Sequence, residues 1–372
     1  MSISIFCLSG LLCITACAIN KQNHLKAVST VEFNLLDTTS RPSLFDYYNL
    51  GGNEYFCNYS KKNYAINMYD FKSQKFLYSI KLSDTLFATG IDGYYIKSLD
   101  SVFVNIRYVN IVALMNREGK IIDSWNIKDS LIYNKDYELF VEANDKLYVH
   151  NNKLYISKMP AVEYSMIPYT CPVIVYDLVN RKILKNTGAF PGKYKKGESW
   201  HLVGYSINKI LTGKGNLVIS YPVSDELYCY NSNDSLVSTI SIPSGYLEKY
   251  SFPPFDVQKR GDAAYKVSYV AELGMYYNLI YDPYREVYYR VVLHPQKFRN
   301  EDRTSNNYND RAWSIMVIDK NFHLLSENYF EARKYRFSYV IVTSKGLLIS
   351  NDHELNPNTD AKKLSFTLFE LQ

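Results

Sequence analysis

One hairpin-like unit recurs along this chain and limits the folds that it can adopt. In NYAINMYDFKSQKFLYSIKL (63–82), an apolar strand is followed by a polar turn with a basic residue and by a second, more alternating strand. The same layout returns in VNIVALMNREGKIIDSWNI (109–127), CPVIVYDLVNRKILKNTG (171–188), DELYCYNSNDSLVSTISIP (225–243) and WSIMVIDKNFHLLSENYF (313–330). Tyrosine occurs 36 times, and Val, Ile and Phe are abundant, which is typical of strands. The sequence therefore predicts an all-β protein with almost no helix.

The two strands of each unit differ in their burial pattern. First strands, such as 111–115 and 173–176, are apolar on both faces, which predicts burial between two neighbours. Second strands alternate, as in Phe76, Tyr78 and Ile80 against Ser79 and Lys81, which predicts burial of one face only. Stacked radial sheets need such inner and outer strands, so the pattern indicates a β-propeller.

A short polar residue ends the first strand of every unit: Asp70, Asn116, Asp177, Asn231 and Asp319. Such side chains hydrogen-bond to backbone two residues further on and so favour a turn. We interpret these five residues as turn formers and not as metal ligands.

We predict six blades, with seven as the fallback. A sixth blade is built from SYVIVTSKGLLISN (338–351) and the last strand, LSFTLFEL (364–371). LIYDPYREVYYRVVLHP (279–295) supplies an inner hairpin for the fifth blade, and residues 296–311 form a polar loop. Six blades over residues 27–371 give about 57 residues each, against roughly 40 to 50 in standard propeller repeats, which leaves room for loops. VEFNLL (31–36) is suited to lie beside the C-terminal strand and close the ring.

The N-terminus carries an apolar run, Ile3 to Ala16, of about fourteen residues, shorter than the roughly twenty that cross a bilayer. Ile14, Thr15 and Ala16 before Cys17 resemble the lipobox of bacterial lipoproteins. The resemblance implies a signal peptide over 1–16, acylation of Cys17, a short tether over 17–26 and one propeller domain over 27–372. Met1 and Ser2 depart from the pattern because they lack the usual positive charge. The alternative is that Ile3 to Ala16 is a buried element of the domain.

The lipobox, the N-terminal strand, the YDF-type hairpins and above all YDPYREVYYRVVLHP resemble a family of Bacteroidetes lipoproteins of unknown function, similar to six-bladed TolB-like propellers. The resemblance covers residues 27–371 and implies the fold and an envelope location. In similar lipoproteins, acidic residues just after the cysteine direct export to the cell surface. Residues 18–21, AINK, contain no acid, so we expect an outer-membrane lipoprotein that faces the periplasm.

Charge, histidine and cysteine usage exclude several classes of function. A net charge of +5 over 372 residues is too dilute to indicate a nucleic-acid partner. The six histidines have no metal-ligand spacing, and we predict no metal or other cofactor. Cys57, Cys171 and Cys229 remain in the mature domain, and we expect three buried free thiols in preference to one disulfide with one thiol left over.

The function that we expect is non-enzymatic: a ligand-binding or protein-interaction platform, held to the membrane through Cys17, for an envelope protein, peptide or glycan. Tyr and Arg recognise protein partners and stack on other groups. The candidate binding residues are Trp200, His201, Tyr284, Arg285, Tyr288, Arg290 and His294. For each of them, packing between blades is the competing interpretation, and Arg290 in particular would bridge two blades.

Two other functions stay open. A metal-dependent hydrolase or lactonase of six-bladed type would need acidic side chains that converge in the channel, and an apolar, aromatic loop face would instead favour the platform. A sensor of envelope polysaccharide or peptide is the third possibility. No GxSxG motif supports a serine nucleophile.

Overall fold

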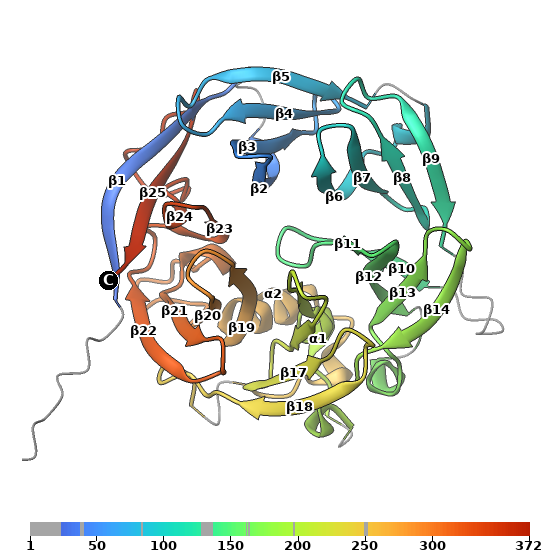
Figure 1. Ribbon diagram of the computed structural model, residues 1–372. Coiled ribbons are helices and arrows are strands. Elements are labelled where there is room, and N and C mark those ends of the chain that lie inside the picture. Colours follow the sequence, from blue (N-terminus) through green and yellow to red (C-terminus); the bar gives the residue numbers. More distant parts are fainter. Residues whose placement is uncertain are drawn as a thin grey trace, which may run out of the picture.

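Six antiparallel sheets stand around a central axis in the computed structural model, which describes residues 24–37, 41–82, 85–127, 137–160, 162, 164–195, 198–248 and 252–372 (Figure 1). The predicted six-bladed β-propeller is confirmed, and the seven-bladed fallback is wrong. The signal peptide and Cys17 lie outside the described residues. No helix in the described ranges is long and apolar enough to cross a bilayer.

Each blade runs from an inner strand at the channel to an outer strand at the perimeter. Blade I consists of β2 (Ser43–Leu50), β3 (Asn53–Ser60), β4 (Ala65–Asp70) and β5 (Phe76–Lys81). Blade II consists of β6 (Ile91–Ser98), β7 (Ser101–Ile106), β8 (Ile111–Met115) and β9 (Ile121–Asn126). Blade III has a divided inner strand and consists of β10 (Tyr137–Phe140), β11 (Tyr148–His150), β12 (Lys153–Pro160), β13 (Val173–Asp177) and β14 (Lys182–Thr187).

The second half of the ring follows the same order. Blade IV consists of β15 (Asn208–Leu211), β16 (Leu217–Ser220), β17 (Glu226–Tyr230) and β18 (Leu236–Ser241). Blade V consists of β19 (Met275–Asp282), β20 (Val287–Leu293), β21 (Trp313–Asp319) and β22 (Leu324–Phe330). Blade VI consists of β23 (Arg336–Val342), β24 (Leu347–Ser350), β25 (Lys363–Leu371) and, at the perimeter, β1 (Leu25–Asn34).

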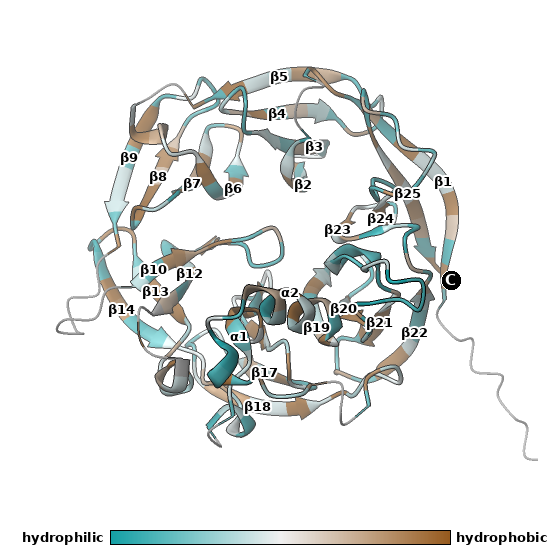
Figure 2. Ribbon diagram, turned by 180° about the vertical axis from the view of Figure 1, so that it is seen from behind, coloured by the Kyte–Doolittle hydropathy of each residue, from teal (hydrophilic) through white to brown (hydrophobic). Residues whose placement is uncertain are grey.

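Burial follows the pattern that the sequence predicted for the recurring hairpins. The third strands β4, β13 and β21 are buried along almost their whole length, because a blade packs on each of their faces. The fourth strands β5, β9 and β18 keep exposed positions, which gives the perimeter its mixed hydropathy (Figure 2). The third and fourth strands of these blades therefore differ in burial as expected.

The five recurring polar residues form the turns between third and fourth strands. Asp70 accepts from the Ser73 backbone at 2.6 Å, and Asn116 accepts from the Lys120 backbone at 2.9 Å. The remaining three accept backbone N–H groups in the same way: Asp177 from Val179 and Asn180, Asn231 from Asn233 and Ser235, and Asp319 from Asn321 and His323. Each turn leads into a β-bulge in the hairpin register. Their predicted role as turn formers is confirmed.

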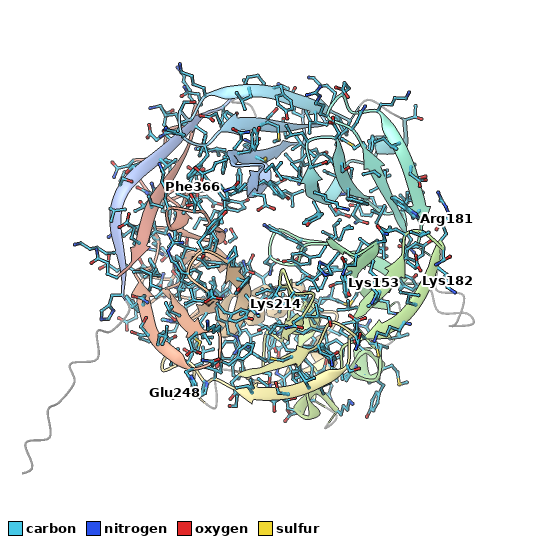
Figure 3. All side chains as sticks on the ribbon, viewed as in Figure 1. Lys153, Arg181, Lys182, Lys214, Glu248 and Phe366 are labelled. Carbon is cyan, nitrogen blue, oxygen red and sulfur yellow. The ribbon has the colours of Figure 1, made fainter. Side chains whose placement is uncertain are left out.

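The ring is closed by pairing the two ends of the chain. β1 pairs antiparallel with β25, with Val31 opposite Phe366 and Phe33 opposite Leu364. Phe33 is fully buried and stacks on Phe56 of blade I with the ring centroids 4.0 Å apart. Figure 3 labels Phe366 within this closing blade. The predicted closure by residues 31–36 is confirmed, and it leaves no gap between blades VI and I.

The two ends of the ring differ because each blade is an antiparallel meander. The turns between first and second strands and between third and fourth strands lie at one end, which we call the turn face. The turns between second and third strands and the connections between blades lie at the other, the insertion face. Leu25 pairs with Leu371 at the turn-face end of β25, so the N-terminal segment leaves the ring there.

The longer insertions all lie on the insertion face, which Figure 2 views. They include α1 (His201–Tyr205), α2 (Ala263–Glu272) and the loop 294–312. The expected all-β fold is confirmed, and α2 is its longest helix among the described residues: Asp262 caps the start of α2 by accepting from the Tyr265 backbone at 3.0 Å. At the C-terminal end of α2, the buried Arg311 guanidinium donates to the carbonyls of Val270, Ala271 and Leu273.

Cys57, Cys171 and Cys229 are free thiols, as expected. Cys57 and Cys229 are buried, and Cys171 is half-buried.

Candidate functional site

A loop from blade III crosses the central channel. Residues 141–147, here called the plug loop, separate β10 from β11 and extend toward the centre of the ring (Figure 1). Glu142 and Asp145 exchange two backbone hydrogen bonds of 3.1 Å, which close the loop on itself. The channel is therefore divided at this level.

The plug loop is fixed to four other blades. Lys146 Nζ lies 2.8 Å from Asp46 Oδ1 of blade I. On blade II, Val141 packs against Gly93, where a Cβ would overlap the Val141 Cγ1 atom. Glycine within a strand marks such a close approach of another segment.

Contacts to blades IV and V hold the other side of the loop. Asn144 Nδ2 donates to the Tyr277 carbonyl of blade V at 3.0 Å. Lys209 Nζ of blade IV donates to Asp145 Oδ1 at 2.7 Å and to Ser157 Oγ at 2.9 Å. Burial raises the pKa of Asp145 and lowers that of Lys209, because loss of hydration outweighs their mutual attraction. This ion pair is fully buried.

Two chambers result, one on each side of the plug loop. The turn-face chamber has a volume of about 650 Å³ and the insertion-face chamber about 530 Å³. Both are lined by Asn144 of the plug loop and by Tyr339 of β23. Volumes of this size are usual for sites that bind small molecules.

The insertion-face chamber carries both signs of charge. Its charged lining residues are Lys61, Asp92, Arg107, Glu138, Glu142 and Arg336. Arg107 Nε lies 2.7 Å from Asp92 Oδ1, so these two largely neutralise each other. The guanidinium carbon of Arg336 lies 5.0 Å from the centre of the Tyr339 ring, in cation–π geometry. Tyr108, 77% exposed, lies at the rim.

Among the acidic residues that line this chamber, Glu142 has a strongly raised pKa. Solvent reaches it from the chamber, but the chamber walls surround its carboxylate. This enclosure, with the nearby Asp145 and Asp92, raises the pKa of Glu142 from 4.5 to about 7. Burial also raises the pKa of Asp92, against the attraction of Arg107. Perturbed carboxylates in a cavity are a common feature of functional sites.

Tyrosine dominates the turn-face chamber. Its lining tyrosines are Tyr47, Tyr48, Tyr95, Tyr148, Tyr281, Tyr284 and Tyr339. Phe45 packs edge-on against Tyr339 with the centroids 4.5 Å apart. Asp46 and Lys146, the pair that fixes the plug loop, also line this chamber.

Of the residues predicted from the sequence, Tyr284 is the one that lines a chamber. It is 44% exposed at the rim of the turn-face chamber. Arg285 beside it is held by Asp282 at 2.8 Å and by the carbonyls of Thr343 and Ser344, so it ties blade V to blade VI.

Tyr288 and Arg290 are buried in β20 away from both chambers. Arg290 donates to Ser220 Oγ and to the carbonyls of Ser224 and Asp225 of blade IV. Its guanidinium carbon lies 3.6 Å from the centre of the Tyr276 ring. Arg290 therefore bridges blades IV and V, which is the packing interpretation given above.

Trp200 and His201 lie together at the start of α1, on the insertion face. Trp200 is buried and its indole N–H donates to the Phe252 carbonyl at 3.4 Å. His201 is half-buried, and its ring packs against that of Phe255 with the centroids 5.2 Å apart. Burial lowers the pKa of His201. The pair is thus separate from the two channel chambers.

His294 belongs to a buried polar cluster between blades IV and V. Its Nε2 lies 3.0 Å from Ser314 Oγ, which also donates to Glu327 Oε1 at 2.6 Å. Tyr246 stacks on the imidazole with the centroids 4.5 Å apart. The serine stands between histidine and carboxylate, whereas a nucleophilic triad places the histidine in the middle, so this cluster is not a triad.

Within the described residues, no group of three or more His, Cys, Asp or Glu side chains lies close enough to hold a metal ion. The charged chamber residues were not anticipated from the sequence, because they come from blades I, II, III and VI and meet only through the ring. Gly93, a glycine inside a strand pattern, was the one local signal of the plug loop.

Comparison with known proteins identifies the family. The model of a domain of unknown function, DUF4221, matches residues 30–329. A crystal structure of a family member from Bacteroides vulgatus is similar, with a TM-score of 0.79 and 20% identity over 95% of this chain and 99% of that chain. A putative exported protein from Bacteroides fragilis has a TM-score of 0.59 and 8% identity, over 95% and 96%. No curated protein matches. The family and fold predicted by resemblance are confirmed, and the chain belongs to the DUF4221 family of domains of unknown function.

Proposed function

We propose that this chain is a lipid-anchored envelope protein of the outer membrane, facing the periplasm, that binds a peptide in the insertion-face chamber without catalysing a reaction. The observation that carries the proposal is the placement of carboxylates and a guanidinium around tyrosine rings in one cavity. A peptide end has the complementary groups: an ammonium or a carboxylate beside apolar side chains.

The carboxylates of Glu138 and Glu142 form no ion pair within the described residues and lie on the same side of the chamber, near the plug loop. Arg336 has a weak ion-pair partner, Glu354, at 4.0 Å, and its Nε donates to Ser338 Oγ at 3.3 Å. A bound peptide would place its ammonium group near Glu138 and Glu142 and its carboxylate near Arg336. Tyr108, Tyr277 and Tyr308 supply apolar and hydrogen-bonding surface between them.

The position of the chamber agrees with an anchor at Cys17. β1 begins at the turn face, and the insertion-face chamber opens at the opposite end. A protein held by its N-terminal segment would thus present the charged chamber away from the membrane. Cys17→Ala should release the protein into the soluble fraction, and continued membrane retention would refute the anchor.

The test of binding uses the purified Cys17→Ala protein against an array of short peptides with free and blocked ends. Arg336→Ala and Glu142→Gln should each weaken the affinity about tenfold or more, because each removes a charge that the ligand neutralises. Arg117→Ala, an exposed turn-face change, is the matched control. Binding that survives both chamber variants, or no binding to the array, would refute the proposal. The metal-dependent hydrolase needs acidic side chains that converge in the channel, and Asp92, Glu138 and Glu142 do line this chamber. However, no group of three or more His, Cys, Asp or Glu among the described residues lies close enough to hold a metal ion.

A further inference from the structure

The turn-face chamber is separate from the charged chamber and has a different chemistry. The plug loop lies between them, and its ties to four blades keep them apart. Seven of the residues that line the turn-face chamber are tyrosines, and aliphatic residues of β15, β19 and β23 fill the spaces between them. Lys214, labelled in Figure 3, belongs to the β15–β16 turn at this end of the ring.

The chamber has no free charge for a charged ligand. Asp46 and Lys146 are its charged lining residues, and they pair with each other at 2.8 Å. Burial raises the pKa of Tyr48, Tyr95 and Tyr148, so these phenols stay protonated and neutral. A charged ligand would lose hydration here without gaining a counter-charge.

Phenol groups of the lining are nonetheless free to bind. The hydroxyls of Tyr95 and Tyr148, whose ring centroids lie 6.3 Å apart, form no hydrogen bond within the described residues. A wholly apolar ligand would cover these groups and leave them unsatisfied, which costs about 1 to 3 kcal/mol for each group. The chamber therefore fits a ligand that offers both ring faces and hydroxyl groups.

We propose that the turn-face chamber binds a neutral oligosaccharide. Its pyranose rings would stack on the tyrosine faces, with Tyr284 at the entrance, and its hydroxyls would exchange hydrogen bonds with the free phenols. Amphipathic rings of Tyr suit this use because each carries an apolar face and a polar tip. This site is independent of the peptide proposed for the other chamber.

The experiment titrates the purified Cys17→Ala protein with neutral trisaccharides, namely maltotriose, cellotriose, xylotriose, mannotriose and chitotriose, by saturation-transfer difference NMR and calorimetry. At least one should bind, with an affinity that is unchanged between 50 and about 500 mM salt because no charge is involved. Tyr284→Ala, which removes an exposed ring, should weaken binding about tenfold or more. Tyr95→Phe and Tyr148→Phe, which remove a hydroxyl only, should weaken it several-fold.

Tyr108→Ala is the matched control, because it removes another exposed tyrosine, at the rim of the other chamber. Circular dichroism and a thermal melt confirm that each variant is folded. Binding that is lost in Tyr108→Ala and kept in Tyr284→Ala would overturn the proposal. A preference for acidic over neutral oligosaccharides, or no binding by the folded protein across the panel, would also overturn it.

Discussion

Lys209 Nζ donates to Asp145 Oδ1 at 2.7 Å, and neither side chain is accessible to solvent. This contact joins the plug loop of blade III to the inner strand of blade IV. It holds the loop across the channel and so keeps the charged and tyrosine-lined chambers apart. The division of the channel depends on this buried ion pair together with the Lys146–Asp46 pair, the hydrogen bond of Asn144 and the packing of Val141 on Gly93.

Lys209→Met should destabilise the protein by about 3 to 5 kcal/mol, because it leaves the Asp145 carboxylate buried without a counter-charge. Equilibrium unfolding in guanidinium chloride measures this loss. The double variant Lys209→Met/Asp145→Leu should recover much of it, since both buried charges are then gone. A double variant that is less stable than the single one would contradict this account.

Gly93→Ala should destabilise the protein by about 1 to 3 kcal/mol, because its new Cβ would overlap Val141 of the plug loop. Urea unfolding measures the change. Gly261→Ala is the control, since a Cβ there meets no atom within 4 Å. Equal stability of the two variants would show that the plug loop does not pack on β6.

Glu142 should give folding stability a specific dependence on pH. Its pKa is about 7 in the folded protein and near 4.5 in the unfolded chain. Between these values the folded state keeps a proton that the unfolded state has lost, so stability should fall as pH rises from 4.5 to 7. Comparing the unfolding free energy of the protein with that of Glu142→Gln isolates the effect. Identical pH profiles would rule it out.

His294 should have the opposite effect. Burial and the nearby Arg311 lower its pKa from 6.5 to about 4. As pH falls from 6.5 to 4, the unfolded chain takes up a proton that the folded protein excludes, so stability should decrease by about 1 to 2 kcal/mol. An imidazole titration by NMR checks the pKa directly. A midpoint near 6.5 in the folded protein would contradict the prediction.

Phe33→Ala should destabilise the protein by about 3 to 5 kcal/mol, because it removes a fully buried ring stacked on Phe56. Limited proteolysis should then cut within β1 well before the other strands. Thr30→Ala on the same strand is exposed and should be nearly neutral. If both variants resist protease equally, β1 is not held by this packing.

The sequence predicted those parts of the fold that local patterns encode. Asp70, Asn116 and Asp319 marked their turns because an Asx side chain acts within a few residues of itself. The alternation of Val31, Phe33 and Leu35 predicted the closing strand for a similar reason. α2 was missed although Asp262 is a good cap, since aromatic residues such as Tyr265 and Tyr269 also fit a strand.

The site was harder to predict because it is a property of the ring. Arg336 lines the same chamber as Glu142, although 194 residues separate them in the sequence. Tyr288 and Arg290 were candidate ligand contacts with packing between blades as the competing interpretation, and β20 is buried along its whole length. Tyr284 lines a chamber because it stands in a turn beyond the buried strand. Position along the blade decided which aromatic residues reach the channel.

The pairing of β1 with β25 has a consequence for the order in which the ring folds. Leu25 and Leu371, which lie at opposite ends of the propeller sequence, are direct partners. Until β25 is in place, β1 has no partner, so blade VI forms only after the strands of the other five blades are available. Such long-range pairing slows folding. We therefore expect an open ring with a single, unpaired first strand to precede the closed one.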